Sequence, residues 1–296
     1  MKILITGGTG LIGQQFIGRF PEHEYKLLTR DPERARSTLG EGYQYFTTLN
    51  ELPSSTRIDV VINLAGEPIV GRRWSDTQKR RLEESRWDTT QALVEWIDRA
   101  ESKPHCFLSG SAIGYYGVDS DAEFSEQSVA IRNDFASKLC SRWEALAQQA
   151  ELHCRVVLLR TGIVLSSSGG AMGKMSLPFK LGLGGPVGSG QQWMSWIHMH
   201  DYLQAIHYLM TSTQSVGAYN LVAPNPVSNR EFVKAFAKAL GRPCVLPAPA
   251  FAIRLALGEA ATLLLDGQHV QPEKLLDDGF DFKFPLIGEA MLDLFG

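Results

Sequence analysis

The stretch Met1-Lys-Ile-Leu-Ile-Thr-Gly-Gly-Thr-Gly-Leu-Ile-Gly13 decides the fold of this chain. A short apolar run breaks into four glycines, and apolar residues then recur at helical spacing, which predicts a strand, a tight turn and a helix. In a dinucleotide fold such glycines make the turn, admit the pyrophosphate and let the helix pack on the strand. The alternative is a plain strand-turn-helix without a ligand. We predict a nucleotide site that includes Gly7, Gly10, Leu11, Ile12 and Gly13.

Length and charge narrow the class of protein. The chain has 296 residues, 44% of them hydrophobic, which suits a nucleotide-binding sheet carrying a smaller appended part. Its net charge is −3, and no long run of one sign points to nucleic acid. The apolar stretch from Phe251 to Leu265 is broken by Arg254 and Glu259 and is too short to span a bilayer. We expect neither a nucleic-acid nor a membrane partner.

The spacing of the cysteines and histidines bears on the cellular compartment of the protein and on whether it binds a metal. The first strand is predicted to begin at residue 2, so we expect no signal peptide, and the four cysteines lie far apart. This pattern is typical of reduced thiols in a cytoplasmic protein. His198 and His200 lack a third ligand at metal spacing, so no metal is expected. A small-molecule substrate is the expected partner, and a homodimer is left open.

The residue after the second predicted strand bears on cofactor choice. The apolar run Tyr25 to Thr29 ends at Arg30, 17 residues after Gly13. An acidic residue near this position suits the ribose hydroxyls of NAD, whereas a basic residue suits the 2′-phosphate of NADP. Arg30 could instead be a solvated arginine near the helix start at Asp31.

Further strands alternate with helices up to residue 165, which predicts an α/β fold with a doubly wound parallel sheet. The remaining strands are expected at Gly42 to Thr47, Ile58 to Asn63, Cys106 to Ser109 and Val156 to Thr161, with a long helix from Trp74 to Ala100. Because ligands bind at the carboxyl ends of such strands, side chains there should converge on one crevice. The candidates for cofactor contact are Asn63, Leu64, Ala65, Gly66, Ser109, Arg160 and Gly162, with Ser111 and the loop to Gly117 beside them.

Several motifs together resemble the extended short-chain dehydrogenases/reductases. They are Thr6-Gly-Gly-Thr-Gly-Leu-Ile-Gly13, Asn63-Leu-Ala-Gly66, Ser111 followed by Tyr115-Tyr116-Gly117, Lys138, and Trp196-Ile-His-Met-His-Asp201. More closely, Lys138-Leu-Cys-Ser-Arg-Trp-Glu144 and Leu183-Gly-Gly-Pro-Val-Gly-Ser-Gly190 resemble the atypical, epimerase-like subgroup of the NAD-dependent epimerase/dehydratase superfamily, with its C-terminal domain. The resemblance covers essentially the whole chain and implies an NAD(P)-binding Rossmann fold and NADP(H).

The resemblance also implies a catalytic tetrad, of which this chain keeps half. Extended members use Asn, Ser, Tyr and Lys; Ser111 and Lys138 match, but Asp134 stands at the tyrosine position and Arg86 at the asparagine position. A carboxylate would stay ionised at neutral pH unless burial raised its pKa. Asp134 could therefore be an acid/base or pair with Lys138 at i,i+4 or with Arg86, on a helix expected from Arg132 to Ala150. Tyr115 and Tyr116 are replacement phenols.

After residue 165 the pattern changes to glycine-rich loops and short elements. We predict a Rossmann domain over residues 1–165 plus about 197–224, and a small interwoven lobe over 166–196 and 225–296. Gln191 to His198 is expected as a strand, Asp201 as the start of a helix, and Ser228 with Glu231 as a capping box. The expected function is an NADP(H)-dependent oxidoreductase or epimerase on a small or nucleotide-linked substrate, and the alternative is a non-catalytic NADP(H) sensor or interaction protein.

Overall fold

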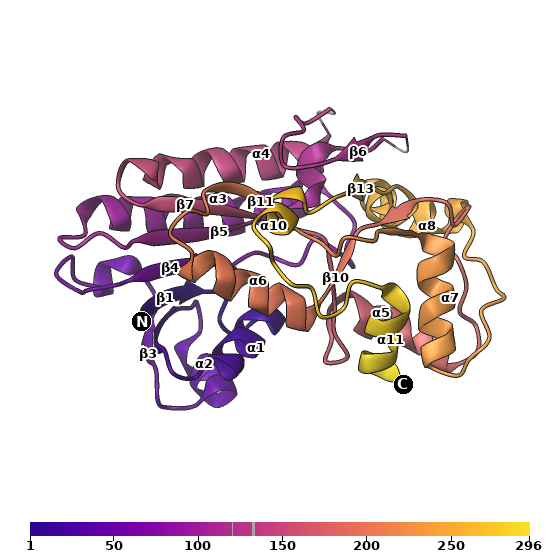
Figure 1. The fold of residues 1–296 in the computed structure, drawn as a ribbon, viewed down its shortest axis with the longest axis horizontal. Coiled ribbons are helices and arrows are strands. Elements are labelled where there is room, and N and C mark those ends of the chain that lie inside the picture. The colour runs from indigo at the N-terminus through magenta and orange to yellow at the C-terminus, as the bar shows by residue number, and fades with distance from the viewer. Residues whose placement is uncertain (120, 132–133) are drawn as a thin grey trace.

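The computed structural model describes residues 1–119, 121–131 and 134–296, and it contains the parallel sheet that the sequence predicts (Figure 1). Neighbouring strands follow the order β11-β7-β5-β4-β1-β2-β3. All six pairings of this sheet are parallel. The strands are β1 (Lys2–Thr6), β2 (Glu24–Leu28), β3 (Gln44–Phe46), β4 (Val60–Asn63), β5 (Cys106–Ala112), β7 (Arg155–Thr161) and β11 (Gly217–Leu221).

Helices cover both faces of the sheet, as parallel strands buried on both sides require. On one face α3 (Asp76–Arg99) and α4 (Phe135–Gln148) pack, and Leu4, Phe107 and Trp96 belong to their shared core. On the other face α1 (Leu11–Arg19) and α6 (Met199–Thr211) pack against a core that includes Ile3 and Ile206. The sheet is therefore doubly wound.

The peripheral elements of this part are short. α2 (Pro32–Leu39) begins at a proline, and Asp31 caps it by accepting a hydrogen bond from the Arg34 amide at 3.0 Å. Three single-turn 3-10 helices join other elements: η1 (Leu49–Glu51), η2 (Ile113–Tyr116) and η3 (Gln149–Leu152).

A separate hydrophobic core lies in the C-terminal part, to the right in Figure 1. It joins α5 (Gly170–Lys180), α7 (Asn229–Ala239) and α11 (Ile287–Phe295) around Phe179, Trp196 and Phe236. Two small sheets lie outside the main sheet: β8 (Ile163–Leu165) pairs with β10 (Trp196–His198), and β9 (Trp193–Met194) pairs with β12 (Val227–Ser228). The predicted capping box is present, with Ser228 accepting from the Glu231 amide at 3.2 Å.

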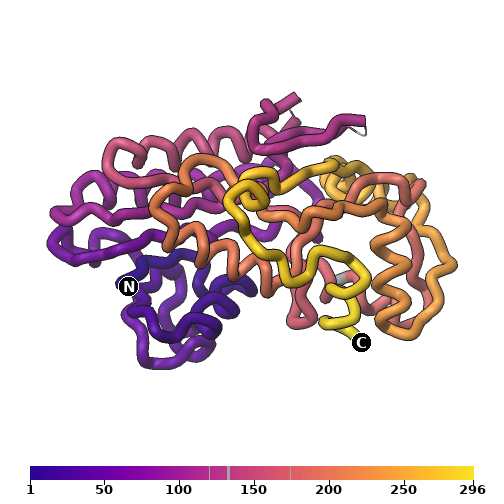
Figure 2. The backbone as a smooth tube through the Cα atoms, in the orientation of Figure 1, coloured from indigo at the N-terminus to yellow at the C-terminus, as the bar shows by residue number. Residues whose placement is uncertain are grey.

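The remaining elements are short, and several of them belong to two smaller hydrophobic clusters. β6 (Glu123–Phe124) pairs with β13 (His269–Val270). The others are α8 (Ala250–Leu257), η4 (Gly258–Ala261), α9 (Thr262–Leu265) and α10 (Glu273–Asp277). The yellow C-terminal segment runs back beside α6 (Figure 2), where the amides of Lys283 and Phe284 donate to the Asp201 carboxylate at 3.0 and 2.9 Å. The expected domain boundaries stay a prediction, which this interweaving supports.

The structure corrects three expectations about local structure. Gln191 to His198 forms two strands rather than one, because Trp193–Met194 pairs with β12 whereas Trp196–His198 pairs with β8. His198, not Asp201, is the N-cap of α6, accepting from the His200 amide at 3.1 Å. The terminal helix α11 was not expected. Among the described residues, no helix is long and apolar enough to cross a membrane.

Candidate functional site

The glycine turn lies where the strand order of the sheet reverses. β1 pairs with β2 on one side and β4 on the other, so Thr6 and Asn63 end neighbouring strands. Ligands of doubly wound sheets bind at this switch point. Gly7 has a φ of 70°, and a Cβ there would lie 2.6 Å from the Leu64 backbone. Only glycine fits this close approach of the two strand ends.

Gly10 and Gly13, two further glycines of the turn, have different surroundings. A Cβ on Gly13 would lie 2.4 Å from the Gly7 carbonyl oxygen, so Gly13 is needed for packing of α1 on the turn. A Cβ on Gly10 would meet that oxygen at 3.1 Å and otherwise point into open space. Gly10 is also the N-cap of α1, and the amides of Leu11 and Ile12 have no acceptor within the helix. The turn thus forms a cradle that an anion can enter.

A segment from the C-terminal part comes close to this turn. Gly170, at the start of α5, would bring a Cβ to 3.1 Å from the Leu11 Cδ2 atom. Gly170 has a φ of 66°, a backbone conformation that glycine adopts readily. The glycine-rich segment therefore borders the crevice.

Arg30 follows β2, next to the same edge of the sheet. Its side chain is exposed. The neighbouring Asp31 carboxylate is engaged as the cap of α2, accepting from the Arg34 amide. The Arg30 guanidinium is thus accessible to an anionic ligand, which agrees with its predicted role.

Buried hydrogen bonds fix the floor of the crevice. The Thr6 hydroxyl donates to the Asn63 side-chain oxygen at 2.7 Å, and the Asn63 amide donates to the Thr90 hydroxyl at 2.8 Å. The Trp143 indole also donates to that hydroxyl, at 2.9 Å. The Asn63 side chain therefore joins β1 and β4 to α3 and α4, and the Thr6 hydroxyl also accepts from the Ala65 amide at 3.2 Å.

Arg86 lies against the loop after β4. Its guanidinium donates to the carbonyls of Leu82 and Glu67, each at 3.1 Å, and lies 5.3 Å from the centre of the Trp143 ring. A Cβ on Gly66 would lie 3.0 Å from the Arg86 Cζ atom. Gly66 therefore makes room for the arginine that stands at the tetrad's asparagine position, and this packing role was not predicted.

The two serines of β5 differ in their partners. The sequence-based prediction ended this strand at Ser109 and placed Ser111 in the following loop. In the structure the strand runs to Ala112, so Ser111 is a strand residue. Its hydroxyl donates to the Glu144 carboxylate at 2.6 Å. Ser109 is fully buried, and its hydroxyl has no hydrogen-bond partner among the described residues.

Arg160 and Tyr116 belong to a buried network. Arg160 donates to both Glu144 oxygens, at 2.9 and 2.8 Å, and to the Tyr116 hydroxyl at 3.0 Å. Tyr116 in turn donates to the Asn220 side chain at 2.6 Å, and burial raises its pKa to about 12. Both were expected to contact ligands. Their contacts favour a supporting role, because the Arg160 guanidinium and the Tyr116 phenol are engaged inside the protein.

Tyr115 is the more accessible of the two tyrosines. It is half-buried, and its ring lies face-on over the Arg160 guanidinium at 3.5 Å from the ring centre. Its backbone oxygen accepts from the Ser137 hydroxyl at 3.0 Å, which ties it to α4. No described residue hydrogen-bonds its own hydroxyl, so this phenol is available to a ligand.

Lys138 and Asp134 lie at the start of α4. The helix begins at Phe135, later than expected, and Arg132 lies outside the described residues. Asp134 is the N-cap and accepts from the Ser137 amide at 2.9 Å. No ion pair among the described residues joins Asp134 to Lys138 or Arg86, and the contact that its carboxylate makes is the cap of the helix backbone. Lys138 is exposed, one turn into the helix.

Gly162 has a packing reason for lacking a side chain. A Cβ there would lie 2.6 Å from both the Ser195 carbonyl oxygen and the Val222 side chain. Gly162 lets the chain leave β7 close to β10. Its predicted contact with the cofactor stays a prediction.

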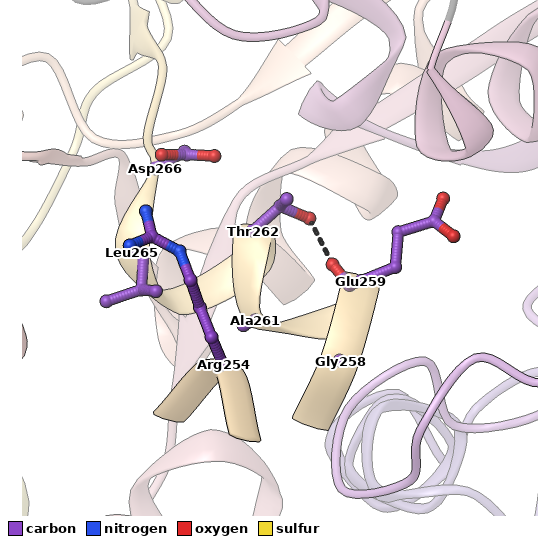
Figure 3. A pocket seen from close by; sticks show the side chains of 7 residues that line it. All are labelled: Arg254, Gly258, Glu259, Ala261, Thr262, Leu265 and Asp266. Atoms are coloured by element: carbon purple, nitrogen blue, oxygen red, sulfur yellow. Dashed lines mark hydrogen bonds between the residues drawn. The ribbon is translucent and has the colours of Figure 1, made fainter. Parts of the chain in front are cut away.

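A pocket of about 370 Å³ opens in the C-terminal part (Figure 3). It is lined by Arg254, Gly258, Glu259, Ala261, Thr262, Leu265 and Asp266. Glu259 also forms an ion pair with Lys79 of α3 at 2.6 Å. The pocket therefore borders the contact between η4 and α3, away from the glycine turn.

Glu144 is the site residue that the sequence did not identify. It belongs to the quoted run from Lys138, but nothing in that run distinguishes it from a solvated glutamate. Helical spacing offers a weak signal, since Cys140 and Ala147 share its buried face of α4. A carboxylate on such a face requires a partner, and the partner, Arg160, lies on a distant strand.

Family models match most of the chain. The model described as the NAD-dependent epimerase/dehydratase family matches residues 3–222, and one described as a domain of unknown function matches residues 248–294. An epimerase family protein of Mus musculus, SDR39U1, is 39% identical over 99% of each chain. One of Staphylococcus aureus is 38% identical over 99% of this chain and 98% of its own length. The crystal structure of human SDR39U1 (isoform 2) with NADPH is 36% identical, with a TM-score of 0.91 over 99% of each chain.

Proposed function

The chain belongs to the NAD-dependent epimerase/dehydratase family, and we propose on that premise that it is an NADP(H)-dependent oxidoreductase or epimerase. Its substrate would be small or nucleotide-linked and would lie between the sheet edge and the C-terminal part. The human relative is described with NADPH, which supports this choice of cofactor. The alternative is a protein that binds NADP(H) without turnover, and the lost tetrad tyrosine favours it.

The observation that carries the proposal is the fit of the glycine turn to a pyrophosphate. A side chain at Gly10 would occupy the one open side of the turn, while Gly7 and Gly13 are fixed by packing. The amides of Leu11 and Ile12 begin α1 there, and the helix dipole adds positive potential. The residues present thus suit a dinucleotide, and the exposed Arg30 suits the 2′-phosphate of NADP(H).

On the substrate side, we assign roles according to accessibility. Lys138 would hold the ribose of the cofactor. When bound, the nicotinamide cofactor supplies hydride transfer. Tyr115 would contact the substrate oxygen, because its hydroxyl is available and the Tyr116 hydroxyl is not. Ser111 is held by Glu144, so a substrate oxygen would accept from Ser111 only if that hydroxyl turned away from the carboxylate.

Tyr115 stands beside a fixed cation. The Arg160 guanidinium lies 3.5 Å from the centre of the Tyr115 ring, so a fixed positive charge lies next to an accessible phenol. The Glu144 carboxylate offsets part of that charge. Tyr115 is therefore the residue of this chain best placed to exchange a proton with a carbinol or carbonyl oxygen.

A turnover screen separates the enzyme from the sensor. Carbonyl compounds and nucleotide sugars are incubated with the purified protein and NADPH or NADP⁺, and the change in nicotinamide absorbance is followed; for epimerisation, which leaves no net change, the sugar products are separated. An enzyme that uses Tyr115 loses at least about 100-fold in kcat on Tyr115→Phe, the contribution of a positioned acid/base. Tyr202→Phe, fully buried in α6, is the matched control. NADPH binding without turnover of any substrate would favour the sensor.

Two further properties, the cellular location and the oligomeric state, belong to the proposal. A cytoplasmic location and a homodimer stay predictions. Size-exclusion chromatography with light scattering tests the homodimer directly.

A further inference from the structure

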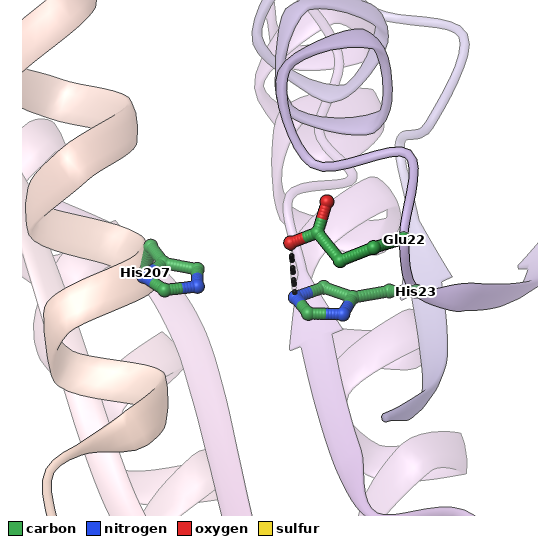
Figure 4. Close-up of side chains that lie close together, drawn as sticks. All are labelled: Glu22, His23 and His207. Carbon is green, nitrogen blue, oxygen red and sulfur yellow. Dashed lines mark ion pairs between the residues drawn. The ribbon is translucent and has the colours of Figure 1, made fainter.

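Three side chains that bind metals in proteins lie together at the amino end of β2. Glu22 and His23 belong to the turn between α1 and β2, and His207 lies on α6 (Figure 4). The ligand atoms that the three offer all lie within 4.8 Å of one another. In Figure 4 the rings of His23 and His207 lie on either side of a gap, with the Glu22 carboxylate beside His23. This cluster is at the opposite end of β2 from Arg30.

His23 is the unusual member of the cluster. Its side chain is only 8% exposed, yet neither ring nitrogen has a hydrogen-bond partner among the described residues. Buried polar atoms are rarely left without a partner, and each exception requires an explanation such as an ion or a water molecule. Its Nε2 atom lies 3.5 Å from a Glu22 oxygen, without the alignment of a hydrogen bond.

Aromatic packing holds the two imidazoles in place. Phe20 stacks on His207 with ring centres 4.4 Å apart and planes 13° apart. The planes of His23 and His207 are parallel to within 1°, with centres 5.9 Å apart. Because α1 and α6 share one hydrophobic core, the spacing of the two histidines is set by the fold and not by their own contacts.

We propose that Glu22, His23 and His207 form a binding site for a divalent transition metal such as Zn²⁺. Zinc binds imidazole nitrogen at about 2.0–2.1 Å and carboxylate oxygen at about 2.0–2.2 Å, so tetrahedral ligand atoms lie about 3.4 Å apart. The Glu22 and His23 pair is already at 3.5 Å, and all the ligand atoms lie within 4.8 Å of one another, so metal binding requires them to approach by at most about 1.4 Å. Two imidazoles and one carboxylate favour zinc over Mg²⁺ or Ca²⁺, which prefer oxygen ligands.

The state of the ligands suits metal binding. Burial lowers the pKa of His23 and that of His207 from the ordinary value, so both rings are neutral near pH 7. A metal requires the neutral imidazole. Three protein ligands leave the fourth position to water, as in open zinc sites.

The bound ion would fasten α6 to the turn before β2. It therefore stabilises the folded chain, by an amount that grows with the logarithm of the ion concentration once that concentration exceeds the dissociation constant. The cluster lies at the amino ends of the strands, whereas the glycine turn lies at the carboxyl ends, so metal and cofactor sites are separate.

The test is calorimetric titration of the apo protein with ZnCl₂, together with thermal unfolding at several zinc concentrations. The matched variants are Glu22→Gln and His207→Phe; the latter keeps an aromatic ring against Phe20 and removes the nitrogens. His105→Ala is the control, because His105 is exposed and lies outside the cluster. Each variant is first checked for a cooperative thermal transition without zinc, and Glu22→Gln, at an exposed position, keeps the test valid if His207→Phe does not fold.

The proposal predicts one zinc ion per chain and a Tm that rises with zinc concentration in the unmodified protein and in His105→Ala. His207→Phe and Glu22→Gln should each weaken binding by more than about 10-fold, the smallest loss usual even for residues that only support a metal ligand. Co²⁺ in place of zinc should give the visible absorption of a tetrahedral site, and His207→Phe should lose it. Binding of less than one zinc ion per chain, or equal binding in all variants, would overturn the proposal.

Discussion

Arg160 and Glu144 form a two-point ion pair in which both side chains are 6% exposed. The guanidinium donates to the two carboxylate oxygens at 2.9 and 2.8 Å. Glu144 also accepts from Ser111, and Arg160 lies under the Tyr115 ring. The pair therefore connects β7 and α4 to the two residues that we place closest to the substrate.

Removing one partner of this pair should destabilise the protein strongly. In Glu144→Gln the Arg160 charge stays buried without a counter-ion, which costs about 3–5 kcal/mol of unfolding free energy. Urea unfolding followed by tryptophan fluorescence measures the loss. Glu151→Gln, at an exposed position close by in sequence, is the control and should change the free energy by less than about 0.5 kcal/mol. A loss of less than about 1 kcal/mol in Glu144→Gln would contradict the interpretation.

Substitutions of two glycines in the turn should affect folding and cofactor binding differently. Gly10→Val places its side chain in the open side of the turn, so the chain should fold and lose NADPH binding. Gly13→Val forces a Cβ to 2.4 Å from the Gly7 carbonyl oxygen, so folding itself should fail or weaken by several kcal/mol. Thermal unfolding and cofactor titration of both variants make the comparison. If Gly10→Val also loses its cooperative thermal transition, Gly10 is required for folding, and the prediction that it is needed only for cofactor binding is contradicted.

Lys138 and Asp134 should differ in their effect on cofactor binding. Lys138→Ala removes a charged contact with the ribose and should weaken binding by about 1.5–3 kcal/mol, or roughly 10- to 100-fold. Asp134→Asn keeps the N-cap, because asparagine caps as well as aspartate, and should change binding and stability by less than about 0.5 kcal/mol. Asp134→Ala should cost about 1 kcal/mol of stability. An Asp134→Asn protein that binds NADPH normally but has no turnover would make Asp134 the acid/base.

His198 should make the fold sensitive to acid. Burial lowers its pKa to about 4, although Asp293 lies 3.3 Å away and opposes the shift. Between pH 6.5 and pH 4 the unfolded chain therefore binds the proton and the folded chain does not, so stability falls as the pH falls. Relative to pH 7.5, the loss at pH 4.5 should be about 2–3 kcal/mol.

The matched variant for this pH effect is His198→Asn, which can still cap α6 and does not titrate. Its urea midpoint should fall less between pH 7.5 and pH 4.5 than that of the unmodified protein. Equal falls in the two proteins would show that other groups cause the acid sensitivity.

The sequence predicted the elements whose signals are local. The glycine turn, the strand that ends at Asn63 and the capping box at Ser228 each depend on residues a few positions apart. Helix α11 was missed because a helix this short depends on packing, here of Met291 in the core shared with α7. The hydrogen bond from Tyr116 to Asn220, 104 residues away, has no signal in the sequence.

The same distinction applies to the site. Motif matching identified Ser111 and Lys138, because these positions follow fixed spacings. It could not identify Glu144, since the need for a buried carboxylate depends on where β7 places Arg160. It also placed Asp134 inside a helix, whereas the side chain of Asp134 begins that helix.

The most direct measurement of the central claim is the ratio of the dissociation constants for NADPH and NADH, obtained by quenching of tryptophan fluorescence. The account predicts that NADPH binds roughly 10- to 100-fold more tightly, the value of one charged contact with the 2′-phosphate, and that Arg30→Ala removes this difference while Arg242→Ala, exposed in the C-terminal part, preserves it. Failure of both nucleotides to bind, or a ratio that Arg30→Ala leaves unchanged, would contradict it.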